Sequence, residues 1–177
     1  MNDEKQDSEA EVLALSLLLL AQGAMGKVLG LRKEDLRAGL DVAKKQLMRG
    51  ASREALRTYG FLVMCDPGDP DFQFGLANCA LHVGEFYIAL QAASAMIALH
   101  PEHARAYYVS GRALLAIGRE DEAVEDLRKA KEFGKQQKDS TIYAQAERWL
   151  KNIEMRHEAH EAPPIEGPEK GKREAGA

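Results

Sequence analysis

The residues best suited to chemistry in this sequence are its histidines, and a few of them lie close together near the C-terminal end. His157 and His160 are separated by one helical turn and stand beside Glu158 and Glu161, so they could in principle hold a metal ion. No further pair of ligands is fixed nearby, and a solvated helix end is the better interpretation. We therefore predict no metal site.

The two cysteines and the missing motifs argue against an enzyme. Cys65 and Cys79 cannot form a disulfide framework, and they indicate a reducing compartment, although one disulfide between them stays open. The sequence contains no glycine-rich phosphate loop, nucleophile elbow or zinc-binding cluster. We expect neither catalysis nor a cofactor.

Composition predicts a helical chain that does not bind nucleic acid. Of 177 residues, 45% are hydrophobic and 29% charged, and only 6 are proline. The net charge of −4 comes from 24 basic and 28 acidic side chains that are mixed throughout, without the basic stripe of a nucleic-acid binder. We predict an all-α fold.

The apolar run Val12–Ala21 needs burial, but it does not predict a membrane segment. It is shorter than the roughly 20 residues that span a bilayer. Acidic residues surround a single Lys5 before it, where a signal peptide would be basic. We interpret the run as a helix packed against protein, and we expect a cytoplasmic protein without a membrane partner.

A repeat of 34 residues organises the central part of the chain. Gly50, Gly84 and Gly118 keep this separation, and so do three further columns: Ala55, Ala89 and Ala123; Ala43, Ala77 and Gly111; Pro67 and Pro101, with Lys135 in the third place. Glycine ends a helix in the left-handed region, small residues let paired helices approach closely, and proline ends the second helix. The columns predict three helix pairs.

This pattern resembles the tetratricopeptide repeat, over about residues 36–137. The resemblance implies a short solenoid with repeats near 36–69, 70–103 and 104–137. We expect a helical arm at 1–34 with an acidic disordered start, a repeat domain at 35–160, and a disordered tail at 161–177. Within the domain, Ser140 would cap the N-terminus of a further helix at 140–160. The apolar face of this capping helix, which includes Ile142 and Trp149, would cover the last pair.

The resemblance also implies a concave groove lined by the first helix of each pair. The family's groove positions map onto nine residues, with His82 near the rim: Leu40, Lys44 and Leu47; Phe74, Asn78 and Leu81; Tyr108, Arg112 and Leu115. Each trio follows one helical stripe. The leucines could equally be ordinary core residues. We expect Phe74, Leu81 and Tyr108 to be partly exposed anchors.

One class of tetratricopeptide proteins grips the acidic C-terminus of heat-shock chaperones with five polar or basic residues. The matching positions here are Leu40, Lys44, Gly75, Arg105 and Val109, of which only two are basic. The sequence argues against that partner.

A closer resemblance is to the class II chaperones of bacterial type III secretion. The segment Tyr59–Asp66 resembles the second helix of their first repeat, and the segment Phe72–Cys79 resembles the opening of their second repeat. The arm, the three repeats and the capping helix fit the same family. The resemblance implies a cytoplasmic chaperone that binds an extended segment of a translocator protein and keeps it soluble and competent for secretion.

Two other functions stay open, namely a tetratricopeptide adaptor or scaffold and a chaperone for needle subunits with a helical client. We also expect a homodimer, because the leucine run is apolar nearly all round and would leave part of its surface uncovered in a monomer. The alternative is an arm that folds back on its own repeats. The dimer contacts would come from Leu13, Leu17, Leu18 and Leu20.

Overall fold

Helix follows helix throughout residues 25–161, the part of the chain that the computed structural model describes. The elements are α2 (Met25–Val28), α3 (Lys33–Met48), α4 (Ser52–Cys65), α5 (Pro70–Val83), α6 (Phe86–Leu99), α7 (Ala104–Ala116), α8 (Glu120–Gln136) and α9 (Ser140–Glu161). Every regular element in this range is a helix, and the predicted all-α class is confirmed.

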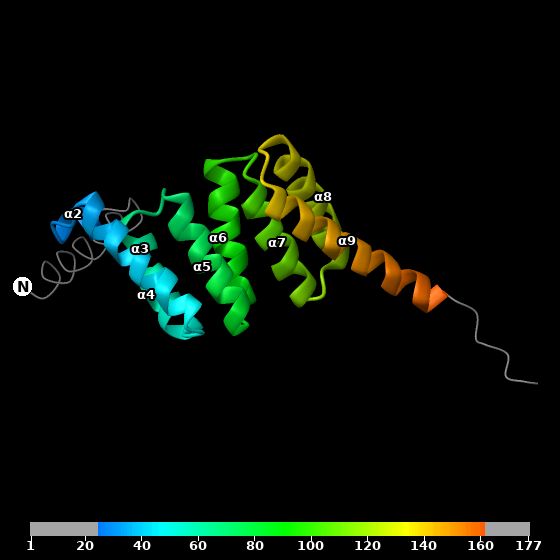
Figure 1. Ribbon diagram of the computed structural model, residues 1–177, viewed down its shortest axis with the longest axis horizontal. Helices are drawn as coiled ribbons and strands as arrows, with labels where there is room; N and C mark the ends of the chain where they lie inside the picture. The colour runs from blue at the N-terminus through cyan, green and yellow to red at the C-terminus, as the bar shows by residue number, and fades with distance from the viewer. Residues whose placement is uncertain (1–24, 162–177) are drawn as a thin grey trace, which may run out of the picture.

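The helices stack in pairs along one direction, as Figure 1 shows. The pairs are α3 with α4, α5 with α6, and α7 with α8, and α9 packs on α8 at the end of the row. The first helices also contact one another, because α5 touches α7 and α7 touches α9. This inner row is the side on which the tetratricopeptide resemblance predicts the groove.

The three predicted glycine turns are confirmed. Gly50, Gly84 and Gly118 have φ angles of 77°, 84° and 81°. After each of them, the next amide donates a hydrogen bond of 2.9 Å to the carbonyl five residues earlier, which closes the first helix of each pair. Because these φ values suit glycine, the turn residue is a backbone requirement.

The second helices end differently where proline is missing. Pro67 and Pro101 follow α4 and α6, which are each 14 residues long. Lys135 stands at the third place, and α8 continues to 17 residues. Two residues after the end of α8, Lys138 makes the left-handed turn with a φ of 58° without being glycine. The length of each second helix therefore follows the proline column.

The small residues of the repeat lie in the core between paired helices. Ala43, Ala77, Ala55, Ala89 and Ala123 are fully buried. A Cβ at Gly111 would lie 2.8 Å from Cγ of Leu127 and 3.1 Å from the carbonyl oxygen of Ala123. The helices thus approach as closely as the two columns predict.

The helix starts agree with the predicted repeats except at the first, and one capping residue was wrong. α5 and α7 begin at Pro70 and Ala104, whereas α3 begins at Lys33, a turn before Leu36.

Asp139, not Ser140, caps α9, because its Oδ1 accepts a hydrogen bond of 3.1 Å from the Ile142 amide. The charge of the aspartate adds a favourable interaction with the positive end of the helix dipole.

Two predicted segments lie outside the described residues. The leucine run with Leu13, Leu17, Leu18 and Leu20 falls in residues 1–24, and the predicted tail falls in 162–177 apart from Glu161, the last residue of α9. Within the described range, no helix is long and apolar enough to cross a membrane.

Candidate functional site

A hollow of about 550 Å³ crosses the concave side from α5 over α7 to α9. Its lining consists of Phe74, Asn78, His82, Arg105, Tyr108, Arg112, Asp139, Thr141, Ile142 and Gln145. Half of the ten predicted groove residues are among them: Phe74, Asn78, His82, Tyr108 and Arg112. The repeat register therefore brings residues of two pairs and the capping helix to one place.

One apolar residue from each of the three helices forms the base of the hollow. Phe74, Tyr108 and Ile142 follow one another at intervals of 34 residues. Phe74 is partly buried, whereas Tyr108 is 7% exposed and Ile142 is 4% exposed. The prediction that Tyr108 is a partly exposed anchor is wrong, because α9 packs on α7 and the ring belongs to the core between them.

Arg105 joins all three helices of the hollow. Its Nε lies 3.3 Å from Oδ2 of Asp139, and its guanidinium carbon lies 5.3 Å from the centre of the Phe74 ring. The other oxygen of Asp139 caps α9. One ion pair and one cation–π contact thus link α5, α7 and the start of α9.

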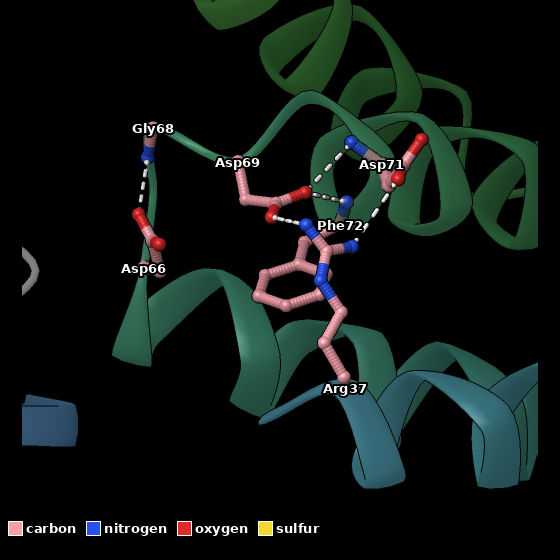
Figure 2. A network of polar contacts seen from close by, with 6 residues as sticks. All are labelled: Arg37, Asp66, Gly68, Asp69, Asp71 and Phe72. Atoms are coloured by element: carbon pink, nitrogen blue, oxygen red, sulfur yellow. Dashed lines mark hydrogen bonds and ion pairs between the residues drawn. The ribbon is translucent and has the colours of Figure 1, made fainter. Parts of the chain in front are cut away.

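The same device holds the first two pairs together (Figure 2). Arg37 of α3 reaches Oδ2 of Asp69 at 2.9 Å and Oδ2 of Asp71 at 3.3 Å, and it lies 5.5 Å from the centre of the Phe72 ring. Oδ1 of Asp69 accepts hydrogen bonds from the amides of Asp71 and Phe72 at 2.9 and 3.2 Å, and so caps α5.

These arginines and aspartates occupy one position of the repeat. Arg37, Asp71, Arg105 and Asp139 are spaced 34 residues apart and pair as Arg37 with Asp71 and Arg105 with Asp139. At α9, Asp139 alone provides the cap and the ion pair that Asp69 and Asp71 share at α5. Alternating charges in one column therefore link α3 with α5, and α7 with the start of α9.

Arg112 lies further along the hollow and contacts two aromatic rings. Its guanidinium carbon is 5.8 Å from the centre of Tyr108 and 5.6 Å from the centre of Trp149. Tyr108 lies one turn before it on α7, and Trp149 comes from α9. The two rings position the guanidinium within the hollow.

The other predicted groove residues lie outside this hollow. Leu40 is 3% exposed and packs in the core of the first pair with Tyr59 and Leu62, so its assignment to a ligand-facing surface is corrected. The reason is that Leu36, Leu40 and Ala43 share the helix face that is turned to α4. Leu47, Leu81 and Leu115 are partly buried against the core, and Lys44 is exposed.

Sequence reasoning missed the part of the hollow that α9 provides. It assigned Ile142 and Trp149 only to the apolar face of a cap, and it left out Asp139, Thr141 and Gln145. The signal was present in the register, because Ile142 stands 34 residues after Tyr108. The start of α9 therefore takes the position that the first helix of a fourth pair would have.

The remaining candidate residues are engaged in packing. Cys65 and Cys79 are both free and buried, so the open question of a disulfide is answered. Burial raises the pKa of the Cys79 thiol to about 11 and also raises that of Cys65. His157 contacts Glu120 of α8, and among the described residues no three histidine, cysteine or acidic side chains gather as a metal site.

Comparison with solved structures shows the fold. The chain matches the type III secretion translocator chaperone SycD of Yersinia enterocolitica with a TM-score of 0.66 and 19% identity, covering 72% of this chain and 96% of that one. PcrH in complex with the chaperone-binding region of PopD gives a TM-score of 0.67 and 22% identity, covering 72% and 97%. PcrH is a protein of Pseudomonas aeruginosa.

The chain has the tetratricopeptide-repeat fold that these structures share. The structural side of the predicted resemblance is confirmed. A tetratricopeptide repeat of Spaghetti (RPAP3) bound to an HSP90 peptide also matches, with a TM-score of 0.63 and 20% identity over 72% of this chain and 96% of that one. The fold is thus shared by proteins inside and outside secretion.

Sequence comparison adds two distant relatives. Cellulose synthase operon protein C of Pseudomonas fluorescens is 28% identical over 129 residues, which are 73% of this chain and 10% of that protein. An FK506-binding protein-like protein of Rattus norvegicus is 33% identical over 105 residues, 56% of this chain and 30% of that protein. The chain spans only a small part of these relatives, and no family model matches it.

Proposed function

We propose that this chain is a bacterial cytoplasmic chaperone that holds an extended segment of a type III secretion translocator in the hollow across α5, α7 and α9. The observation that carries the proposal is the position of that hollow. It lies on the inner row of first helices in a fold that is shared with translocator chaperones.

The lining of the hollow suits an extended polypeptide. Phe74 offers a partly buried apolar surface, while Asn78 and Arg112 carry donors for backbone or side-chain oxygens. Burying one apolar anchor contributes ~1.5–3 kcal/mol. Ordering a flexible segment costs ~2–5 kcal/mol. One anchor alone does not offset this cost, so the polar contacts in the hollow have to contribute as well. We therefore expect weak, reversible binding, which suits a client that must later be released.

Several matching structures contain a bound translocator segment. PcrH was solved with the chaperone-binding regions of PopD and PopB, and SycD with a peptide of the translocator YopD. Those complexes place a translocator segment on a protein of this fold. They support a client of the same kind here.

The main alternative is a tetratricopeptide adaptor or scaffold, and one partner of that kind would be a heat-shock peptide like the HSP90 peptide bound to the Spaghetti domain. The positions of the five-residue clamp do not favour it. Leu40, Gly75 and Val109 are buried, and Arg105 is paired with Asp139. Among these five positions, Lys44 is therefore the one cation without an ion pair within the described residues. A secretion client therefore fits the residues better than a heat-shock tail.

Affinity capture after co-expression with candidate translocators tests the proposal. We expect Phe74→Ala to reduce the captured translocator about tenfold, in line with the loss of one buried anchor. Tyr87→Ala is the matched control, because Tyr87 is an aromatic residue of α6 that is 73% exposed outside the hollow. It should capture as much client as the unchanged chain.

Two results would contradict this function. Equal capture by Phe74→Ala and Tyr87→Ala, with both variants folded, would place the client elsewhere. A bound segment that is helical by NMR chemical shifts would favour the needle-subunit alternative, since the proposal requires an extended one.

A further inference from the structure

Arg112 is a partly buried cation without an acidic partner among the described residues. Its side chain makes neither an ion pair nor a hydrogen bond within residues 25–159, although it lies in the hollow. A guanidinium that is partly removed from water without hydrogen bonds is unfavourable. The two rings of Tyr108 and Trp149 compensate only its charge.

The contrast with Arg105 shows what is different about Arg112. Arg105 also contacts an aromatic ring, but its Nε–H donates a hydrogen bond to Oδ2 of Asp139, with 3.3 Å between nitrogen and oxygen. Asp139 also caps α9, so this carboxylate is already committed. The lining of the hollow contains two arginines and one aspartate, which leaves one positive charge in excess.

The chemistry of a stacked guanidinium defines its partner. A ring attracts the flat face of the group, and the N–H donors point outward in its plane. Those donors match the two oxygens of a carboxylate in a bidentate pair. The other side chains of the hollow near this part of α9, Thr141 and Gln145, are neutral.

We propose that Arg112 receives an aspartate or glutamate side chain of the bound segment and thereby selects clients with an acidic residue beside their apolar anchor. The inference rests on the proposed function of the groove. An internal side chain fits better than a C-terminal carboxylate because α7 is the middle helix of the hollow. A segment that runs from Phe74 on α5 to Gln145 on α9 passes Arg112 between its ends.

Selection from a phage library of short random peptides, displayed with both ends joined to the coat protein, tests the proposal. Peptides selected on the full chain should be enriched in Asp or Glu at one position. A selected peptide is then synthesised with blocked termini, once with Glu and once with Gln at that position. We expect the Glu peptide to bind about tenfold more tightly, the effect of one charge-assisted hydrogen-bonded pair.

Variants assign the preference to the residue. Arg112→Gln should bind both peptides equally, while Arg148→Gln, an exposed arginine of α9 outside the hollow, should keep the preference. In the unchanged chain, the Nε–H signal of Arg112 in a heteronuclear NMR spectrum should shift with the Glu peptide and not with the Gln peptide. This last readout decides the matter even if Arg112→Gln fails to fold.

The outcomes separate this inference from the function on which it rests. Equal binding of the Glu and Gln peptides, with both weakened by Phe74→Ala, would overturn the role of Arg112 and leave the groove intact. Selected peptides whose binding is insensitive to Phe74→Ala would overturn the groove itself. A preference that arises only when the C-terminal carboxylate is unblocked would overturn the choice of a side chain.

Discussion

The ring of Tyr59 lies directly against the backbone of Gly75, so that a Cβ at residue 75 would be 2.0 Å from Cε1 of the ring. Tyr59 belongs to α4 and Gly75 to α5, and their contact forms the junction between the first and second helix pairs. The ring is 3% exposed, and burial raises the pKa of its hydroxyl to about 12. The missing side chain at residue 75 is therefore a packing requirement.

Replacing Gly75 with alanine should destabilise the protein. The added methyl group has to displace a buried ring, which costs about 1–3 kcal/mol. Gly60→Ala is the control, because Gly60 is also helical, in α4, and a Cβ there would meet nothing within 4 Å. That change should stabilise by about 0.5–1 kcal/mol. Urea unfolding followed by circular dichroism measures both, and effects of the same sign would contradict the packing described.

Lys138→Gly should raise the free energy of unfolding. Lys138 holds a φ of 58° after α8, and the amide of Asp139 donates to the carbonyl of Gly134 at 2.9 Å, as in the glycine turns. Lysine in the left-handed region costs ~1–2 kcal/mol, which glycine would remove. Glycine also raises the entropy of the unfolded chain, which costs ~0.4–1 kcal/mol of stability, so the expected net gain is ~0.5–1 kcal/mol.

The control for this change is Lys135→Gly, an exposed lysine inside the last turn of α8. It should lower the free energy of unfolding, since glycine inside a helix is unfavourable. Thermal and urea unfolding of the two variants give the comparison. A loss of stability in Lys138→Gly would show that the left-handed turn is not strained.

The contact of Glu120 with α9 should make stability depend on pH. His157 and Arg156 hydrogen-bond its carboxylate and lower its pKa below the ordinary 4.5, the contact with His157 being the larger cause. A lowered pKa contributes stability that is present above pH 4.5 and is lost as the pH falls through the folded-state value. Acidification from neutral pH should therefore reduce the melting temperature.

Glu120→Gln removes this contribution. Its melting temperature should lie below that of the unchanged chain at pH 7, and the difference should shrink at pH 3. Glu158→Gln is the control, because it changes the same charge on α9 at an exposed position. A difference between Glu120→Gln and the unchanged chain that stays constant with pH would refute the linkage.

Self-association through the arm stays a prediction. The leucine run Val12–Ala21 precedes α2 in the sequence. Val28, the last residue of α2, and Leu29 after it are 72% and 54% exposed. We expect the full chain to sediment as a dimer at about ten micromolar or more, and a chain that starts at Leu31 to sediment as a monomer. A full chain that stays monomeric, or a shortened chain that dimerises equally well, would exclude the arm as the interface.

The regular elements of this protein could be predicted from the sequence because they depend on local requirements. Gly50, Gly84 and Gly118 have to be left-handed wherever their helices end, and the alanine columns have to be small wherever paired helices cross. Such requirements recur at a constant spacing, so the 34-residue register contains the number of pairs, their turns and their order.

Which side chains face the hollow depended on contacts between helices that are far apart in the chain. Leu40 and Phe74 hold the same repeat position, yet Leu40 is buried against α4 while Phe74 lines the hollow beneath Arg105. The pairing of Arg105 with Asp139 and the contact of Arg112 with Trp149 both need α9 to pack on α7. The repeat assigns a residue to a face of its helix, but the neighbouring helix decides whether that face is covered.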